Sequence, residues 1–103
     1  DRETVLAPGI RVVPAPGHTP GHLAVSVADG VDELLWAADA FVHPANVADP
    51  EPASRMDTDR ERTVATRREL LERAVQRRAI LAAAHHRVRG RVVRDGAGYR
   101  LEP

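Results

Sequence analysis

The stretch PAPGHTPGHLAV, residues 14–25, decides how the rest of the chain can be arranged. It places His18 and His22 four residues apart, the spacing by which a zinc-binding helix aims two imidazoles from one face. Its glycines and prolines would break a helix, so we predict a tight turn between two strands, with the two imidazoles pointing in different directions. Such a rigid turn is a good mount for one metal ligand. The alternative is a turn histidine that only makes hydrogen bonds.

Short apolar runs on both sides of this turn predict strands. Residues 22–28 alternate between apolar and small or polar side chains up to Asp29-Gly30, which predicts a half-buried strand leading into a hairpin. Residues 34–38 are apolar on both faces, which predicts a central strand covered from both sides. The predicted strands are residues 9–15, 22–28, 34–38, 79–84, 91–94 and 99–101.

One main amphipathic helix is predicted from residue 58 to about residue 78. Thr58 and Glu61 have the spacing of a capping box. A stripe of apolar residues follows at helical spacing: Val64, Leu71, Ala74 and Val75. Residues 41–56 are rich in proline and small polar residues, which predicts an irregular crossover loop. A single helix among short strands places the chain in the α/β or α+β class.

Length and composition exclude several classes of protein. The 103 residues predict one domain, residues 1–103. Fifteen basic residues balance fifteen acidic ones, so the chain lacks the positive field that nucleic-acid binding needs. There is no cysteine, which excludes disulfides and a thiol nucleophile. No apolar run approaches the roughly 18 residues of a membrane span. We therefore expect neither a nucleic-acid nor a membrane partner, and a cytoplasmic location.

Three candidate metal ligands stand at strand ends or in the turns beyond them. Besides His18, these are Asp39, which follows the apolar run 34–38, and one of the pair His85-His86, which follows another buried run. Adjacent residues of an extended backbone point to opposite faces, so at most one of the pair should face a shared site. Asp39 has an alternative role as a capping or turn acceptor. Imidazole and carboxylate together suit zinc and other divalent metals.

The order of these elements and motifs resembles the C-terminal half of a metallo-beta-lactamase-fold hydrolase, in the branch that contains lactonases and organophosphate hydrolases. The resemblance implies roughly one half of an αβ/βα sandwich, built on a mixed sheet. Four stretches carry it and cover nearly the whole chain: PAPGHTPGHLAV at 14–25, LLWAADAFVHP at 34–44, TRRELLERA at 66–74 and AAAHHRVRGRVVRDGAGYRLEP at 82–103.

The resemblance also implies a set of site residues. His18 would complete a three-histidine zinc site, Asp39 would bridge two zinc ions as the catalytic carboxylate, and His85 would belong to the second site. His22 would support the same turn, and His43 would lie near a small-molecule substrate such as a lactone or ester. His85 is preferred to His86 because Gly90 then lies at the distance from the ligand that is usual in the family.

The sequence departs from the family pattern in one important respect. The family's His-x-His-x-Asp-His motif, which supplies four ligands upstream of the GHTPGH turn, does not occur in these 103 residues. We therefore expect that the N-terminal half of the fold is missing and that the chain is inactive alone. We also expect an exposed apolar sheet face, covered by a second copy or by a complementing N-terminal half. The alternative is a non-catalytic remnant or protein-interaction module.

Overall fold

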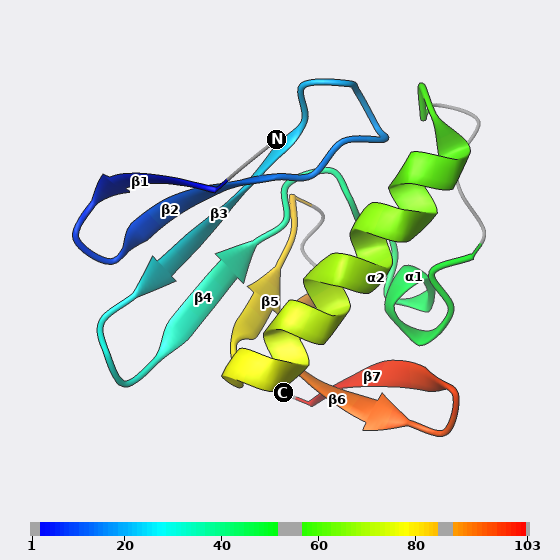
Figure 1. Ribbon diagram of the computed structural model, residues 1–103. Coiled ribbons are helices and arrows are strands. Elements are labelled where there is room, and N and C mark those ends of the chain that lie inside the picture. Colours follow the sequence, from blue (N-terminus) through cyan, green and yellow to red (C-terminus); the bar gives the residue numbers. More distant parts are fainter. Residues whose placement is uncertain (1–2, 52–56, 85–87, 103) are drawn as a thin grey trace.

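The computed structural model describes residues 3–51, 57–84 and 88–102, and within them one sheet of seven strands runs in the order β1-β2-β3-β4-β5-β6-β7 (Figure 1). Neighbouring strands are antiparallel except β4 and β5, which are parallel, so the sheet is mixed as expected. The strands are β1 Thr4–Ala7, β2 Ile10–Pro14, β3 Leu23–Ala28, β4 Glu33–Trp36, β5 Ile80–Ala82, β6 Arg89–Asp95 and β7 Gly98–Glu102.

The parallel pair β4 and β5 requires a crossover connection, and this connection contains both helices. Helix α1, Ala45–Ala48, is a single turn, whereas helix α2, Arg60–Arg77, runs along one face of the sheet (Figure 1). The side chain of Asp59 caps α2 by accepting a hydrogen bond from the backbone N–H of Arg62. The helix ends where Arg78 takes a left-handed conformation at φ 53°.

The core lies between α2 and the face of the sheet that it covers. Register places Leu35 of β4 beside Ser26 of β3 and Leu81 of β5, and all three are buried. The helix meets this face with Leu70, Leu71 and Ala74, which are buried. Other buried apolar residues extend this cluster: Val13, Ala15, Ala24, Ala37, Ala40, Phe41, Val47, Ala79, Ala83, Val88 and Val92. Many of these side chains are alanine or valine, so the core is thin.

The opposite face of the sheet carries apolar side chains that no described element covers. Register aligns them in two rows, Val12-Val25-Trp36-Ala82 and Ile10-Val27-Leu34-Ile80. Trp36 is 39% exposed and Leu34 is 40% exposed. The expectation that residues 34–38 are covered from both sides is therefore wrong for the part of the chain that the structure describes. The expectation of an exposed apolar sheet face holds there.

Three further predictions need adjustment, and one strand was not predicted. Residues 41–56 are not irregular throughout, because Ala45–Ala48 form α1. The cap of α2 is Asp59 rather than Thr58. The buried stripe of α2 includes Thr63, Thr66 and Arg67, whereas Val64 is only partly buried. The structure also contains β1, which the sequence did not predict.

Across the described residues, no helix is long and apolar enough to cross a membrane.

Candidate metal site

The turn at residues 15–22 is held by its own backbone. The N–H of Ala15 donates to the carbonyl of His22 at 2.9 Å, and the N–H groups of Gly17 and His22 both donate to the carbonyl of Thr19. Gly17 is buried with φ 139°, and a Cβ there would lie 2.4 Å from the backbone nitrogen of Thr63 in α2. Only glycine allows the turn to pack this closely against the helix. The turn is therefore anchored to α2.

His18 lies between two carboxylates. Its Nδ1 is 3.1 Å from Oδ1 of Asp57, whose side chain is only 2% exposed. Its Nε2 is 4.0 Å from Oδ2 of Asp39. The His18 side chain is 28% exposed, so one edge of the ring stays accessible. The ring thus reaches from a buried carboxylate on one side to a partly exposed one on the other.

Asp39 sits in the turn that follows β4. The strand ends at Trp36, and the N–H of Ala37 still donates to Ala82 of the parallel neighbour at 2.7 Å. Ala38 then takes a positive φ of 49°, which turns the chain and brings Asp39 toward the His18 turn. The side chain of Asp39 is 48% exposed. The carboxylate is available to a ligand, as expected for a residue beyond the end of a strand.

His22 connects the two turns through both ring nitrogens. Its Nδ1 lies 2.9 Å from the carbonyl of Ala15 and therefore carries the proton, and its Nε2 accepts a hydrogen bond from the backbone N–H of Asp39 at 3.0 Å. Both nitrogens are occupied, so His22 has no lone pair left for a metal ion in this arrangement. Its ring meets that of His18 edge to face, with centroids 5.8 Å apart.

Arg67 of α2 is a buried cation next to the same region. Its side chain is buried, and its Nε donates to the carbonyl of Ala40 at 2.7 Å. A second nitrogen donates to the carbonyl of Pro50 at 3.3 Å. Burial lowers the pKa of the Arg67 guanidinium below its usual value, and the charge of Asp57 opposes that shift. The helix therefore holds the loop that carries Asp39.

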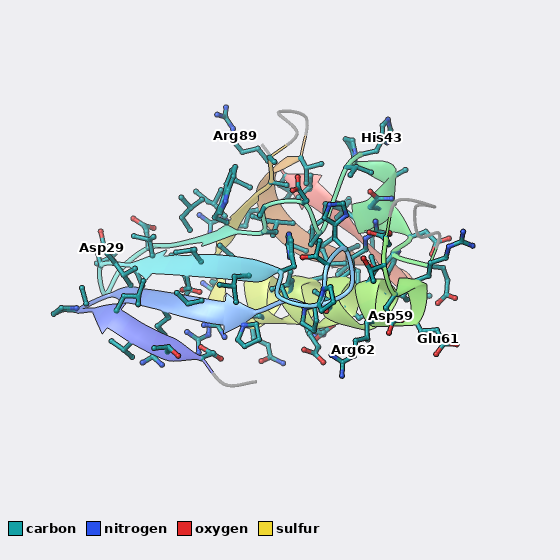
Figure 2. The ribbon with its side chains drawn as sticks, turned by 90° about the horizontal axis from the view of Figure 1, so that it is seen from above. Asp29, His43, Asp59, Glu61, Arg62 and Arg89 are labelled. Carbon is teal, nitrogen blue, oxygen red and sulfur yellow. The ribbon has the colours of Figure 1, made fainter. Side chains whose placement is uncertain are left out.

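The remaining candidate residues lie apart from this cluster or outside the described chain. His43 is exposed and points outward beside α1 (Figure 2), where its Nδ1 accepts a hydrogen bond from the N–H of Ala45 at 3.0 Å. His85 and His86 lie outside the described residues. The structure thus brings together His18, His22 and Asp39 of the residues that the sequence singled out.

The donor set at His18 and Asp39 fits a divalent metal in its chemistry. An imidazole nitrogen and a carboxylate oxygen are both zinc ligands, and two such donors on one tetrahedral ion stand roughly 3.4 Å apart. The observed 4.0 Å exceeds this separation by about 0.6 Å, and the Asp39 side chain is 48% exposed. No group of three potential ligands occurs among residues 3–51, 57–84 and 88–102. The described residues therefore bring together two candidate ligands, one fewer than the three protein ligands of a usual catalytic zinc site.

Sequence reasoning missed two residues of this region, Asp57 and Arg67. Asp57 lies 39 positions from His18, and it precedes a helix, where an acidic residue ordinarily indicates a cap. Arg67 is one of fifteen arginines, and nothing in its position marks it as buried. The one available signal was its place within the stripe of α2 that faces the sheet.

No family model and no curated protein sequence matches this chain, but solved structures do. The dizinc quorum-quenching lactonase AidC, in complex with the product N-hexanoyl-L-homoserine, matches 100% of this chain and 36% of its own, with a TM-score of 0.86 and 24% identity. The hydrolase AbOPH of the beta lactamase superfamily matches 94% of this chain and 35% of its own, with a TM-score of 0.82 and 25% identity. An N-acyl homoserine lactone hydrolase with a product at its catalytic metal centre matches 84% and 34%, with a TM-score of 0.73 and 23% identity.

These likenesses define the class of fold. The chain has the α/β fold of part of a metallo-beta-lactamase-type hydrolase, as its motifs predicted. It spans about a third of the length of the solved structures that it matches. One of those proteins is named a dizinc lactonase, and another is named an N-acyl homoserine lactone hydrolase.

Proposed function

We propose that this chain is the C-terminal portion of a dinuclear, zinc-dependent hydrolase acting on a lactone, an ester or a related small molecule. One observation carries the proposal: Nε2 of His18 and Oδ2 of Asp39 lie 4.0 Å apart at neighbouring turns of the sheet. The fold shared with AidC, a dizinc lactonase, supports the proposal independently of this distance. A cytoplasmic location stays a prediction.

Each residue has a distinct part in this proposal. His18 would hold one ion through Nε2, Asp39 would be the catalytic carboxylate shared by both ions, and His85 would be a ligand of the second ion. Zinc bound there would activate water at neutral pH and polarise the carbonyl or phosphoryl group that it attacks. His22 and Arg67 hold the backbone on either side of Asp39, which keeps the carboxylate in place while charge develops on the substrate. We keep His43 as a residue near the substrate.

The ligands of this chain are too few for two ions. A catalytic zinc ion usually has three protein ligands, whereas His18, Asp39 and His85 would serve both sites. The remaining ligands have to come from further polypeptide, either a complementing N-terminal half or another chain. We expect weak zinc binding and little turnover from these 103 residues alone.

Hydrolysis assays test this proposal directly. The purified chain is incubated with zinc and with N-acyl homoserine lactones and simple esters, and its size is followed by size-exclusion chromatography. Zinc uptake that depends on His18 and Asp39, without efficient turnover, is the expected result. Efficient hydrolysis by the strictly monomeric chain would contradict the incomplete site. Absence of zinc uptake at millimolar zinc would contradict the assignment of the ligands.

A second candidate function is that of a non-catalytic module that binds a protein. The open apolar face, with Leu34 and Trp36 about 40% exposed, favours it. The two functions differ in what they require of the metal residues. If the module function holds, His18→Ala and Asp39→Ala leave self-association or partner binding unchanged. If the hydrolase function holds, the same variants lose zinc.

A further inference from the structure

Asp57 contacts the imidazole of His18 from the segment that leads into α2. Its side chain is 2% exposed, and its Oδ1 is 3.1 Å from Nδ1 of His18. The backbone on either side of the contact is fixed as well. The N–H of Thr58 donates to the carbonyl of His18 at 3.1 Å, and the N–H of Asp59 donates to the carbonyl of Gly17 at 2.9 Å. Two backbone hydrogen bonds therefore hold the segment of Asp57 against the turn of His18.

This contact decides which ring nitrogen of His18 carries the proton. A carboxylate only accepts hydrogen bonds, so the nitrogen that faces Asp57 has to donate, and in the neutral ring the proton sits on Nδ1. The lone pair is then on Nε2, the atom that lies 4.0 Å from the Asp39 carboxylate. Ligating histidines in metalloproteins show this same pattern, with the second ring nitrogen bonded to a carboxylate or carbonyl.

The positive charge of Arg67 offsets the cost of burying the Asp57 carboxylate. An ionised carboxylate buried without a partner is costly, and the guanidinium of Arg67 lies close enough to interact with the Asp57 carboxylate. Arg67 in turn binds the carbonyl of Ala40, the residue after Asp39. Asp57, just before α2, thus contacts the His18 turn, and Arg67 within α2 contacts the Asp39 loop.

We infer that Asp57 is a positioning residue that holds His18 in the Nδ1-protonated tautomer, with Nε2 directed at Asp39, and thereby strengthens divalent-metal binding at His18. The tautomer is a property of the chain itself, whereas the gain in metal affinity rests on the proposed function. The two parts can therefore be tested separately.

Nitrogen-15 NMR of the imidazole groups tests the tautomer in the metal-free chain. The signals of His18 are assigned by their loss in His18→Ala. In the wild type we expect a protonated Nδ1 and an unprotonated Nε2. Asp57→Asn keeps the shape of the side chain and removes its charge, and we expect a mixture of tautomers there. Asp59→Asn is the matched control: it removes the same charge two residues away, asparagine caps a helix as well as aspartate does, and the wild-type pattern should remain.

Competition with a chromophoric zinc chelator tests the metal part. Loss of the outer carboxylate should weaken zinc binding by about 10- to 100-fold in Asp57→Asn. Asp59→Asn should bind zinc like the wild type. If the wild type binds no zinc, the proposed function fails for this chain, and the tautomer experiment alone decides the role of Asp57.

Two results would overturn the inference. One is a wild-type His18 protonated mainly on Nε2, a measurement that needs no variant and holds even if Asp57→Asn does not fold. The other is a folded Asp57→Asn protein in which His18 keeps the wild-type tautomer. If the wild type binds zinc, this variant would also have to bind zinc with the wild-type affinity. In that case another group sets the orientation of His18.

Discussion

The imidazole of His22 joins the carbonyl of Ala15 to the backbone N–H of Asp39, at 2.9 Å and 3.0 Å. The ring thereby connects the end of β2 to the turn after β4. In the sheet β3 lies between β2 and β4 and pairs with both, so the side chain links two segments that are not neighbours in the sheet. The position of the Asp39 carboxylate depends on this contact.

Replacing His22 by alanine should destabilise the fold. The change leaves the carbonyl of Ala15 and the N–H of Asp39 without their partner, at a cost of about 1–3 kcal/mol. Urea unfolding monitored by circular dichroism measures the loss. The control is His43→Ala, which removes an exposed imidazole and should change the free energy of unfolding by less than about 0.5 kcal/mol. Equal effects of the two variants would contradict the role assigned to His22.

Gly17 should tolerate no side chain. Its φ of 139° costs about 1–3 kcal/mol for a non-glycine residue, and the added Cβ would press on the backbone of Thr63 at 2.4 Å. Gly17→Ala should therefore unfold at clearly lower urea concentration. Gly21 of the same turn is the control, since it has open space around it and no positive φ, and Gly21→Ala should be nearly neutral.

Arg67→Met and Arg68→Met make a matched pair of neighbours on α2. Arg67 is buried and binds the carbonyls of Ala40 and Pro50, whereas Arg68 is exposed and pairs with Glu51 on the surface. Removing the buried cation should cost about 3–5 kcal/mol. Removing the exposed one should cost at most about 1 kcal/mol. Thermal unfolding of both variants measures the difference. A similar loss of stability in each would contradict the prediction that the buried Arg67 contributes more to stability than the exposed Arg68.

Tyr99, the one tyrosine of the chain, reports on the contact between β7 and α2. Burial, followed by the hydrogen bond to Glu72, raises the pKa of Tyr99 above its usual 10.0. The neutral phenol is favoured in the folded state, so its contribution to stability is present below pH 10 and is lost as the pH rises through the folded pKa. Ultraviolet titration of tyrosinate measures this pKa directly.

Glu72→Gln should lower the pKa of Tyr99 toward 10.0 without reaching it, because burial is the larger cause of the shift. Glu69→Gln, one turn earlier on the exposed side of the helix, should leave the pKa unchanged. A Glu69→Gln shift as large as that of Glu72→Gln would indicate general electrostatics instead of this hydrogen bond.

Local chemistry explains which parts of the fold could be predicted. The turn at residues 15–22 followed from glycines and prolines that exclude a helix, and the strand at residues 22–28 followed from its alternation. The edge strand β1 was missed because Thr4–Ala7 is mostly exposed and shows no buried face. Helix α1 is a single turn, too short for a periodic pattern.

The candidate site was predictable only where its residues belong to a motif. His18, His22 and Asp39 stand at turns that the sequence marks, and the structure brings them together. Asp57 and Arg67 act through contacts 39 and 27 positions away, to His18 and Ala40, and local patterns carry no information about such distances. The prediction of His85 as a ligand stays open, since it lies outside the described residues.

The central claim, that His18 and Asp39 form a metal site in this chain, is tested most directly by equilibrium dialysis against zinc followed by elemental analysis. The wild type and His43→Ala should take up zinc equally, and His18→Ala should lose that uptake. A wild-type chain that takes up no more zinc than His18→Ala would contradict the claim, and the search for a function would then move to the open apolar face of the sheet.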